Sequence, residues 1–286
     1  MKILVTGITG FIGSRLACEL AGGHHNIIGI VRKKRHNPEL ERLKIPVLIA
    51  DLAKGFSLTK TVDIIVHTAG QNLVNGAKTE DYIRDNLSSM VNLLRYARFH
   101  KVKKFIFLSS ISIYGKVGEK FVNENTPIVN PESYGLTKFL GERLLLEEAK
   151  WLPSVALRLP GIVGKGAKTC WLANIAKRLK KNEPIQVYNP GSYFNNMVYL
   201  GDLGKFVANI LHNEFKGFEA VTLGCAEPLT VMETVQYLKY LLHSKSEVKI
   251  AESERTAFTI SISKAEKMGY HSLPATKILD AYSKEV

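Results

Sequence analysis

Three glycines near the start of the chain, Gly7, Gly10 and Gly13, constrain its fold more than any other feature. They follow an apolar run over residues 3–6 and precede apolar residues at helical spacing over 12–20, which predicts a strand, a tight turn and a helix. The first glycine permits the turn, the second lets backbone N–H groups approach a pyrophosphate, and the third lets the helix pack closely on the strand. The helix N-terminus would point its unpaired N–H groups at the phosphates. The segment therefore predicts a dinucleotide site.

Behind this segment, short apolar runs alternate with longer helical patterns along the chain. Such alternation predicts a parallel sheet with helices on both faces, the doubly wound α/β (Rossmann) fold. The predicted strands cover residues 26–31, 46–50, 62–66 and 104–108, and two predicted helices cover residues 81–97 and 134–150. At 286 residues the chain has room for this domain and for a smaller lobe.

Arg32 stands at the end of the second predicted strand, about 20 residues after the glycines. An NAD-binding domain usually has Asp or Glu at this point, where it accepts hydrogen bonds from the ribose 2′-OH. The planar guanidinium of Arg32 instead suits a 2′-phosphate, which predicts NADP in preference to NAD. The alternative is that Arg32 belongs to a solvated basic loop, which is how we interpret residues 33–35.

Polar and small residues follow the next two predicted strands, at the edge where an open parallel sheet binds ligands. Asp51 can reach an adenine amino group, or it can cap the segment that follows. The small residues 68–70 suit a backbone that runs past the cofactor, whereas His67 is interpreted as a packed, hydrogen-bonded residue. Asn86 lies on or beside the buried stripe of its helix and needs amide partners, so it either orders a water or a lysine or has a structural role.

A serine at a strand end and a Tyr-x-x-x-Lys pair supply groups suited to proton transfer. Ser110 follows the strand 104–108, and Tyr134 and Lys138 share one helix face because they are four residues apart. The lysine ammonium, together with a positive nicotinamide ring, would lower the tyrosine pKa from its ordinary value of about 10. We therefore expect the phenol to transfer protons near neutral pH, with the serine hydroxyl holding the substrate oxygen.

The charge balance does not by itself identify a partner. A net charge of +13 and an isoelectric point of about 9.5 would suit nucleic acid. The basic residues, however, are spread along the chain without an aromatic-interleaved stripe, so we expect no nucleic-acid partner. Anionic small molecules such as nucleotide sugars also benefit from a positive field.

The sequence contains no segment that predicts a membrane, export or metal site. No apolar stretch approaches the roughly 18 residues needed to cross a bilayer, and the N-terminus lacks a signal-peptide layout. Cys18, Cys170 and Cys225 are scattered, and no His or Cys cluster has metal-ligand spacing. We expect a cytoplasmic protein with reduced thiols, no membrane partner and no metal.

Taken together, these motifs resemble an extended short-chain dehydrogenase/reductase of the NAD(P)-dependent epimerase/dehydratase family. The matching segments run in the family's order over essentially the whole chain: residues 6–13, 109–115, 134–138, 157–164, 195–203 and 261–265, followed by Gly269 and Tyr270. The resemblance implies a catalytic triad of Ser110, Tyr134 and Lys138. It also implies a homodimer formed through helices that include the one carrying Tyr134.

The motifs and the resemblance together define the candidate residues and domains. The cofactor-binding set is Thr6, Gly7, Gly10, Phe11, Ile12, Gly13, Arg32, Asp51, Leu52, Thr68, Ala69, Gly70, Asn86, Tyr134, Lys138, Pro160, Gly161, Ile162 and Val163. The substrate-binding set is Ser110, Ser112, Tyr134, Asn195, Asn196 and Tyr199. Residues 1–164 and 196–224 are assigned to the dinucleotide-binding domain, and residues 165–195 and 225–286 to a small, discontinuous α+β substrate lobe.

Two departures from the family pattern narrow the expected chemistry. Ile111 and Ser112 stand where the family's sugar-nucleotide dehydratases carry an Asp-Glu pair, and the fucose-forming epimerase-reductases have a cysteine at the place of Ser112. Both reactions are therefore disfavoured. Asn195 stands where many sugar-nucleotide epimerases carry an arginine that clamps the substrate diphosphate. The missing charge could come instead from Lys165, Lys168 or Arg178.

Our leading prediction is an NADP(H)-dependent oxidoreductase that reduces a 4-keto nucleotide sugar in surface-polysaccharide synthesis. Tyr134 would donate the proton, Ser110 would orient the oxygen and Lys138 would hold the cofactor ribose. The alternatives are a sugar-nucleotide 4-epimerase that retains NAD, a reductase of a non-sugar ketone, and an NADP(H)-sensing regulator without catalysis. Because Tyr134 and Lys138 are both intact, the regulator is disfavoured.

Overall fold

The computed structural model describes residues 1–33, 35–73, 76–253 and 256–286. The chain divides into two compact units, each built from several segments. The first unit comprises Met1–Gly115, Asn130–Arg158 and Gly204–Val221, and the second comprises Lys116–Val129, Leu159–Leu203 and Thr222–Val286. Residues 116–129, 159–164, 196–203 and 222–224, which the sequence assigned to the dinucleotide-binding domain, thus belong to the second unit. The domain boundaries drawn from the sequence remain a prediction.

A seven-stranded sheet organises the first unit, in the order β12-β7-β5-β4-β1-β2-β3. The strands are β1 (Lys2–Thr6), β2 (Asn26–Val31), β3 (Val47–Ile49), β4 (Ile64–His67), β5 (Lys104–Ser110), β7 (Ser154–Leu159) and β12 (Phe218–Thr222). The pairings of β1 with β2, β1 with β4, β2 with β3 and β4 with β5 are parallel. The chain leaves β1 towards β2 on one side and returns to β4 on the other, so the strand order reverses beside β1. Open parallel sheets bind ligands at such a switch point.

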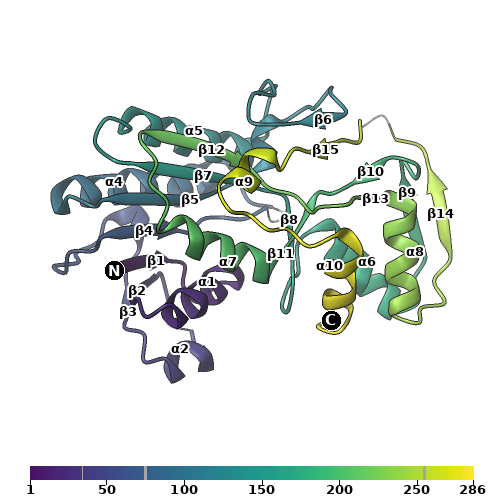
Figure 1. The fold of residues 1–286 in the computed structure, drawn as a ribbon, viewed down its shortest axis with the longest axis horizontal. Coiled ribbons are helices and arrows are strands. Elements are labelled where there is room, and N and C mark those ends of the chain that lie inside the picture. Colours follow the sequence, from purple (N-terminus) through teal and green to yellow (C-terminus); the bar gives the residue numbers. More distant parts are fainter. Residues whose placement is uncertain (34, 74–75, 254–255) are drawn as a thin grey trace. The chain divides into compact units, whose positions relative to one another are not determined.

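Helices cover both faces of this sheet, as the doubly wound pattern predicts (Figure 1). Helices α4 (Ser89–His100) and α5 (Ser133–Glu147) lie on one face, and α1 (Phe11–Gly22) lies on the other. Apolar side chains of β1, β4, β5 and α4 form one continuous core, in which Leu4, Ile65, Met90, Leu93 and Phe105 are buried. The predicted doubly wound fold is confirmed.

The predicted helix over residues 81–97 is not a single α-helix. It consists of α3 (Thr79–Tyr82), a π-helix η2 (Ile83–Ser88) and then α4. A π-helical turn carries an extra residue per hydrogen-bonded ring and occurs frequently at functional sites. The spacing of apolar residues over 81–97 did not indicate the π-helix, because one wider turn changes that spacing very little.

The second unit is built from two-stranded pairings and from helices, among them the short α9 (Ser263–Lys267). Strand β8 (Gly161–Val163) pairs with β11 (Met197–Tyr199), and β9 (Ile185–Tyr188) pairs with β14 (Val248–Ala251), both in parallel. The short strands β10 (Tyr193–Phe194) and β13 (Leu229–Thr230) form an antiparallel pair, and β6 (Phe121–Val122) and β15 (Thr259–Ile260) form a parallel pair. Helices α6 (Trp171–Lys180), α8 (Val231–Leu241) and α10 (Ala275–Ser283) enclose a separate apolar core.

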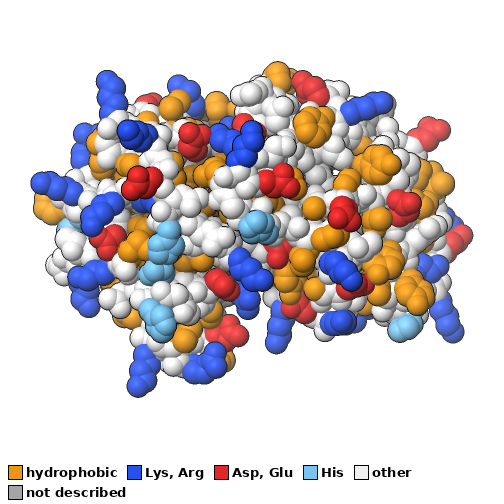
Figure 2. Space-filling model, in the orientation of Figure 1, with side chains coloured by type: hydrophobic (Ala, Val, Ile, Leu, Met, Phe, Trp, Pro, Cys, Tyr) orange, Lys and Arg blue, Asp and Glu red, His pale blue; other side chains and the backbone are white. Residues whose placement is uncertain are grey.

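Charged side chains of both signs are interspersed over the face seen in Figure 2. Among the described residues, no helix is long and apolar enough to cross a membrane. The three cysteines are free thiols, and the described part of the chain contains no group of His, Cys, Asp and Glu that could hold a metal ion.

Candidate functional site

The glycine turn after β1 is shaped by two close backbone approaches. Gly7 has a φ of +64°, and a Cβ there would lie 3.0 Å from the backbone of Ala69. A Cβ on Gly13 would lie 2.3 Å from the carbonyl oxygen of Gly7 and 2.8 Å from Thr68 Oγ1. Both positions therefore require glycine, one for its conformation and the other for helix α1 to approach the turn.

A buried hydrogen-bond network fixes the ends of β1 and β4 beside this turn. Thr6 Oγ1 accepts hydrogen bonds from the backbone N–H groups of Thr68 and Ala69, each at 3.1 Å. Its own proton must then go to His67 Nδ1, 2.8 Å away, which places the imidazole proton on Nε2. Burial, followed by the charge of Lys138, lowers the pKa of His67 to about 3. His67 is thus a packed, neutral residue, as predicted.

The N-terminus of α1 has the features that an anion requires. Its N-cap residue, Gly10, offers no side-chain hydrogen bond, and its first turn contains no acidic residue. The N–H groups of this turn therefore face no competing carboxylate or hydroxyl from the cap or the first turn. Together with the space that Gly7 and Gly13 leave free of side chains, this fits the pyrophosphate of a dinucleotide.

Arg32, immediately after β2, is held by a carboxylate that the sequence did not single out. Its Nη1 donates to Asp85 Oδ2 at 2.9 Å, and Asp85 Oδ1 accepts from Arg84 Nε at 2.8 Å. Burial raises the pKa of Asp85, but the hydrogen bonds from Arg84 and Arg32 outweigh it and keep that pKa below its ordinary value. Arg32 is thus part of a charge cluster rather than an isolated cation. Lys34, in the basic run that follows, lies outside the described residues.

Asn86, next to Asp85 in η2, ties the segment after β4 to helix α5. Its Oδ1 accepts from the backbone N–H of Gln71 at 2.7 Å, and its Nδ2 donates to Thr137 Oγ1 at 3.0 Å. A Cβ on Gly70 would lie 2.8 Å from Asn86 Oδ1 and 3.7 Å from Lys138 Nζ. The amide thus has the structural role that the sequence left open, and its contact with a cofactor remains a prediction.

The structure brings Ser110, Tyr134 and Lys138 together in the first unit. The Ser110 hydroxyl is close enough to the Tyr134 phenol to influence its pKa. It donates to Ser112 Oγ at 3.1 Å and accepts from the Ser112 N–H. Lys138 Nζ donates to the carbonyl of Leu108 at 2.8 Å and lies 5.9 Å from the centre of the Tyr134 ring. The strand end after β5 and the first turns of α5 therefore form one polar cluster.

Burial is the largest influence on the pKa values of this cluster. Burial raises the pKa of Tyr134, and the nearby Ser110 hydroxyl only opposes this shift. The Lys138 ammonium donates to the Leu108 carbonyl. The expected lowering by Lys138 together with a nicotinamide ring remains a prediction. Burial lowers the pKa of Lys138 itself to about 8, while Glu142 acts in the opposite direction.

Sequence reasoning missed a buried ion pair behind this cluster. Glu142, one helical turn after Lys138, accepts hydrogen bonds from Arg158 Nη2 at 2.8 Å and from Ser109 Oγ at 2.6 Å. Arg158 Nη1 also donates to the Tyr114 hydroxyl at 2.9 Å. These contacts join β5, β7, α5 and η3 (Ile111–Tyr114), the elements on which the triad stands. A glutamate within the predicted helix, four residues after the lysine, was the available signal.

Asp51, another predicted residue of the first unit, caps the short helix η1 (Leu52–Lys54). Its Oδ1 accepts from the Ala53 N–H at 3.1 Å, and Asn92 donates to the carbonyl of Leu52 at 2.8 Å. The structure thus shows the capping role, and the contact with adenine remains a prediction.

The second unit contains the other predicted residues, and it distinguishes the two neighbouring asparagines. Asn195 is buried with its amide occupied, since Oδ1 accepts from Ile260 N and Nδ2 donates to Ile260 O, each at 2.8 Å. Asn196 Oδ1 is also buried but has no partner among the described residues. Tyr199 donates to Glu285 at 2.9 Å. Within this unit, residues 160–163 include β8, which pairs with the strand that contains Tyr199.

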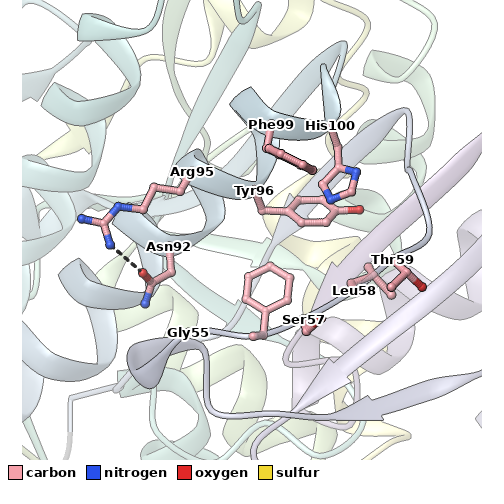
Figure 3. A pocket seen from close by; sticks show the side chains of 10 residues that line it. Gly55, Ser57, Leu58, Thr59, Asn92, Arg95, Tyr96, Phe99 and His100 are labelled. Carbon is pink, nitrogen blue, oxygen red and sulfur yellow. Dashed lines mark hydrogen bonds between the residues drawn. The ribbon is translucent and has the colours of Figure 1, made fainter.

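A cavity of about 670 Å³ lies between the loop after η1 and the second half of α4 (Figure 3). Phe56, Tyr96, Phe99 and His100 line it together with Arg95. Tyr96 donates to the carbonyl of Lys60, a few residues before β4 begins. The cavity therefore lies towards the end of the sheet at which β4 starts, whereas the glycine turn and the triad follow strand ends.

Comparisons with known proteins agree with this arrangement. The family model described as NAD dependent epimerase/dehydratase family matches residues 3–224. The chain is 30% identical over 311 aligned residues to a Bacillus subtilis (strain 168) protein named "Uncharacterized UDP-glucose epimerase YtcB", with 100% of this chain and 97% of that protein covered.

Solved structures share the fold at lower sequence identity. A UDP-glucuronic acid 4-epimerase from Bacillus cereus in complex with NAD is similar with a TM-score of 0.85 and 22% identity, covering 100% of this chain and 98% of that one. A UDP-glucose 4-epimerase from Thermotoga maritima with UDP-glucose has the same TM-score and coverage at 20% identity.

Proposed function

The chain belongs to the NAD dependent epimerase/dehydratase family, and on that premise we propose that it epimerises a nucleotide sugar at C4. The observation that carries the proposal is the cluster of Ser110, Tyr134 and Lys138 beside the glycine turn. The name of the Bacillus subtilis relative supports a UDP-sugar as the substrate class. The missing Asp-Glu pair at Ile111 and Ser112 argues against dehydration.

The residues of the glycine turn fit a nicotinamide dinucleotide, which would supply reversible hydride transfer when bound. Gly7, Gly10 and Gly13 would admit its pyrophosphate to the N-terminus of α1. Lys138 would bind the ribose hydroxyls through the ammonium that now donates to the Leu108 carbonyl. We include the other predicted cofactor contacts, among them residues 160–163 of the second unit, in this proposal.

Tyr134 would move the proton at the sugar oxygen through its phenol Oη. Ser110, whose hydroxyl lies near that phenol, would hold the same oxygen and keep the proton path short. Burial keeps the free phenol protonated at neutral pH, so it is ready to donate. A bound cation beside it would then lower its pKa and let it accept the proton in the reverse direction.

A second candidate, reduction of a 4-keto nucleotide sugar with NADPH, is favoured by Arg32. An arginine at the end of β2, where NAD-binding domains usually carry an acid, supports a 2′-phosphate. We therefore keep the preference for NADP over NAD as a proposal. A cytoplasmic location, a homodimer and a place in polysaccharide synthesis also remain predictions.

In the second unit, we propose that Asn196 contacts the substrate. Its buried Oδ1 lacks a hydrogen-bond donor among the described residues, and a sugar hydroxyl would supply one. Asn195 is a weaker candidate because its amide already holds Ile260.

The deciding experiment is nuclear magnetic resonance of two reactions of the purified protein. The first contains UDP-glucose and no added nicotinamide dinucleotide, and the second contains NADPH and a 4-keto sugar nucleotide. Formation of the C4 epimer without an added nicotinamide dinucleotide supports the epimerase. Oxidation of NADPH in the presence of the keto sugar supports the reductase. We expect Tyr134→Phe to lower the rate by about 10²–10⁴-fold. Tyr96→Phe, which removes a buried hydroxyl far from the triad, should leave it nearly unchanged. No reaction with either substrate would refute both candidates.

A further inference from the structure

Two consecutive side chains of the π-helix η2 contact the segments that follow β2 and β4, the two strands on either side of β1. Asp85 reaches Arg32 after β2, and Asn86 reaches the backbone of Gln71 after β4. Both side chains are buried. The π-helical turn therefore places the Asp85 carboxylate at the end of β2, where NAD-binding domains usually carry Asp or Glu and this chain has Arg32. Asp85 lies 53 residues after Arg32 in the sequence.

Asp85 and Arg32 differ sharply in exposure. The Asp85 side chain is 7% exposed, whereas the Arg32 side chain is 54% exposed. A guanidinium carries five N–H donors, and the contact with Asp85 uses one of them, on Nη1. The other N–H donors of Arg32 can therefore bind a further anion while the buried Asp85 carboxylate remains paired with Nη1.

The charges of the cluster cancel. Arg32 and Arg84 both contact Asp85, and Arg84 Nη1 also lies 3.1 Å from Asp81 Oδ1, so two guanidiniums face two carboxylates. A phosphate that approaches Arg32 therefore meets a neutral cluster, with Asp85 as the nearer carboxylate to that arginine. Repulsion between like charges sets specificity as effectively as attraction does.

From this arrangement we propose that Asp85 is a specificity-determining residue that weakens the selection of a 2′-phosphate by Arg32. The inference rests on the proposed role of Arg32 in cofactor binding. The Arg32–Asp85 pair, rather than Arg32 alone, then sets the ratio of NADP to NAD affinity. An uncharged 2′-hydroxyl does not experience this repulsion, so Asp85 affects NAD much less than NADP.

The test is isothermal titration of the full chain with NADPH and with NADH, comparing the wild type with Asp85→Asn. Removal of the carboxylate should raise the affinity for NADPH relative to NADH by about tenfold, and high salt should shrink this gain. Asp81→Asn is the matched control, because Asp81 pairs with Arg84, whereas Arg32 pairs with Asp85. We expect that variant to leave the ratio within about twofold.

Arg32→Ala separates failure of this inference from failure of the proposed role of Arg32. If Arg32→Ala weakens NADPH selectively but Asp85→Asn leaves the ratio unchanged or lowers it, the role of Asp85 is refuted and that of Arg32 stands. If neither variant changes the ratio, the cluster does not contact the 2′ position and both assignments are wrong. An equal gain in Asp81→Asn would show a general charge effect, which also refutes a specific role for Asp85.

Discussion

Arg158 and Arg32 each pair with a carboxylate in the first unit, but their surroundings are opposite. The Arg158 and Glu142 side chains are 7% and 2% exposed, and the guanidinium uses Nε, Nη1 and Nη2 on Glu142 and Tyr114. Arg32 is half-exposed and uses one donor on Asp85. The first pair lies between packed elements, and the second lies at the open end of a strand.

This difference shows that an arginine–carboxylate pair can either join packed elements or remain available to a ligand, depending on its burial. A fully buried pair must satisfy nearly all its donors internally, because an unpaired charge there has no water to replace its partner. It can therefore hold elements together but cannot bind a ligand. A pair with one buried and one exposed member keeps donors for an incoming anion, and its strength responds to solvent and salt.

The largest expected effect comes from breaking the buried pair. Glu142→Gln should lower the free energy of unfolding by about 3–5 kcal/mol, because Arg158 is left as an uncompensated buried charge. Urea unfolding measures this loss, with the exposed Glu147→Gln on the same helix as the control. The double variant E142L/R158M should recover most of it. A loss below about 1 kcal/mol for Glu142→Gln would show that the pair is not structural.

A smaller effect should follow from acidification, through the buried neutral His67. The unfolded chain protonates this histidine near its ordinary pKa of about 6.5, whereas the folded state resists protonation until about pH 3. Between these values the unfolded state binds more protons, so stability falls as the pH decreases. We expect a loss of about 1 kcal/mol between pH 7.5 and 5.5. Urea midpoints should fall less in His67→Asn, whose amide oxygen can still accept the Thr6 proton; an equal fall would assign the loss elsewhere.

The smallest effect on stability should come from the half-exposed pair. Asp85→Asn should lower the free energy of unfolding by less than about 1 kcal/mol, since water solvates the released Arg32. The difference from wild type should shrink further when NaCl is raised from about 0.05 to 0.5 M. The Glu142→Gln difference should change little, because salt does not screen a buried pair to the same degree. A large, salt-independent loss in Asp85→Asn would remove the contrast between the two pairs.

Local patterns predicted much of the candidate site. Gly7 and Gly13 were identified because a turn and a close helix each require the absence of a Cβ, and both requirements hold. Tyr134 and Lys138 were paired because helical geometry places residues four apart on one face. In each case the interacting groups are close in sequence or follow a recognisable strand, so the pattern contains the geometry.

The contacts that were missed join segments far apart in sequence. Asp85 meets Arg32 across 53 residues, and Asn195 holds Ile260 across 65. Nothing in the composition near Arg32 indicates a carboxylate, because the π-helical turn that presents it leaves no mark in the apolar spacing. The lowered Tyr134 pKa was expected from Lys138 together with a nicotinamide ring, and no local pattern indicated that the ammonium donates to the Leu108 carbonyl.

The sequence by itself determined the doubly wound fold, and it predicted the glycine turn and the grouping of Tyr134 with Lys138, because strand periodicity, glycine conformation and helical spacing are local properties of the chain. Only the tertiary structure decided which charges neutralise one another and which side chains remain available. It paired Arg158 with Glu142 in the core, paired Arg32 with Asp85 at a strand end, and occupied Asn195 while leaving the Oδ1 of Asn196 without a donor among the described residues. The physical reason is that burial and hydrogen-bond partners depend on how distant segments pack, which no local pattern contains.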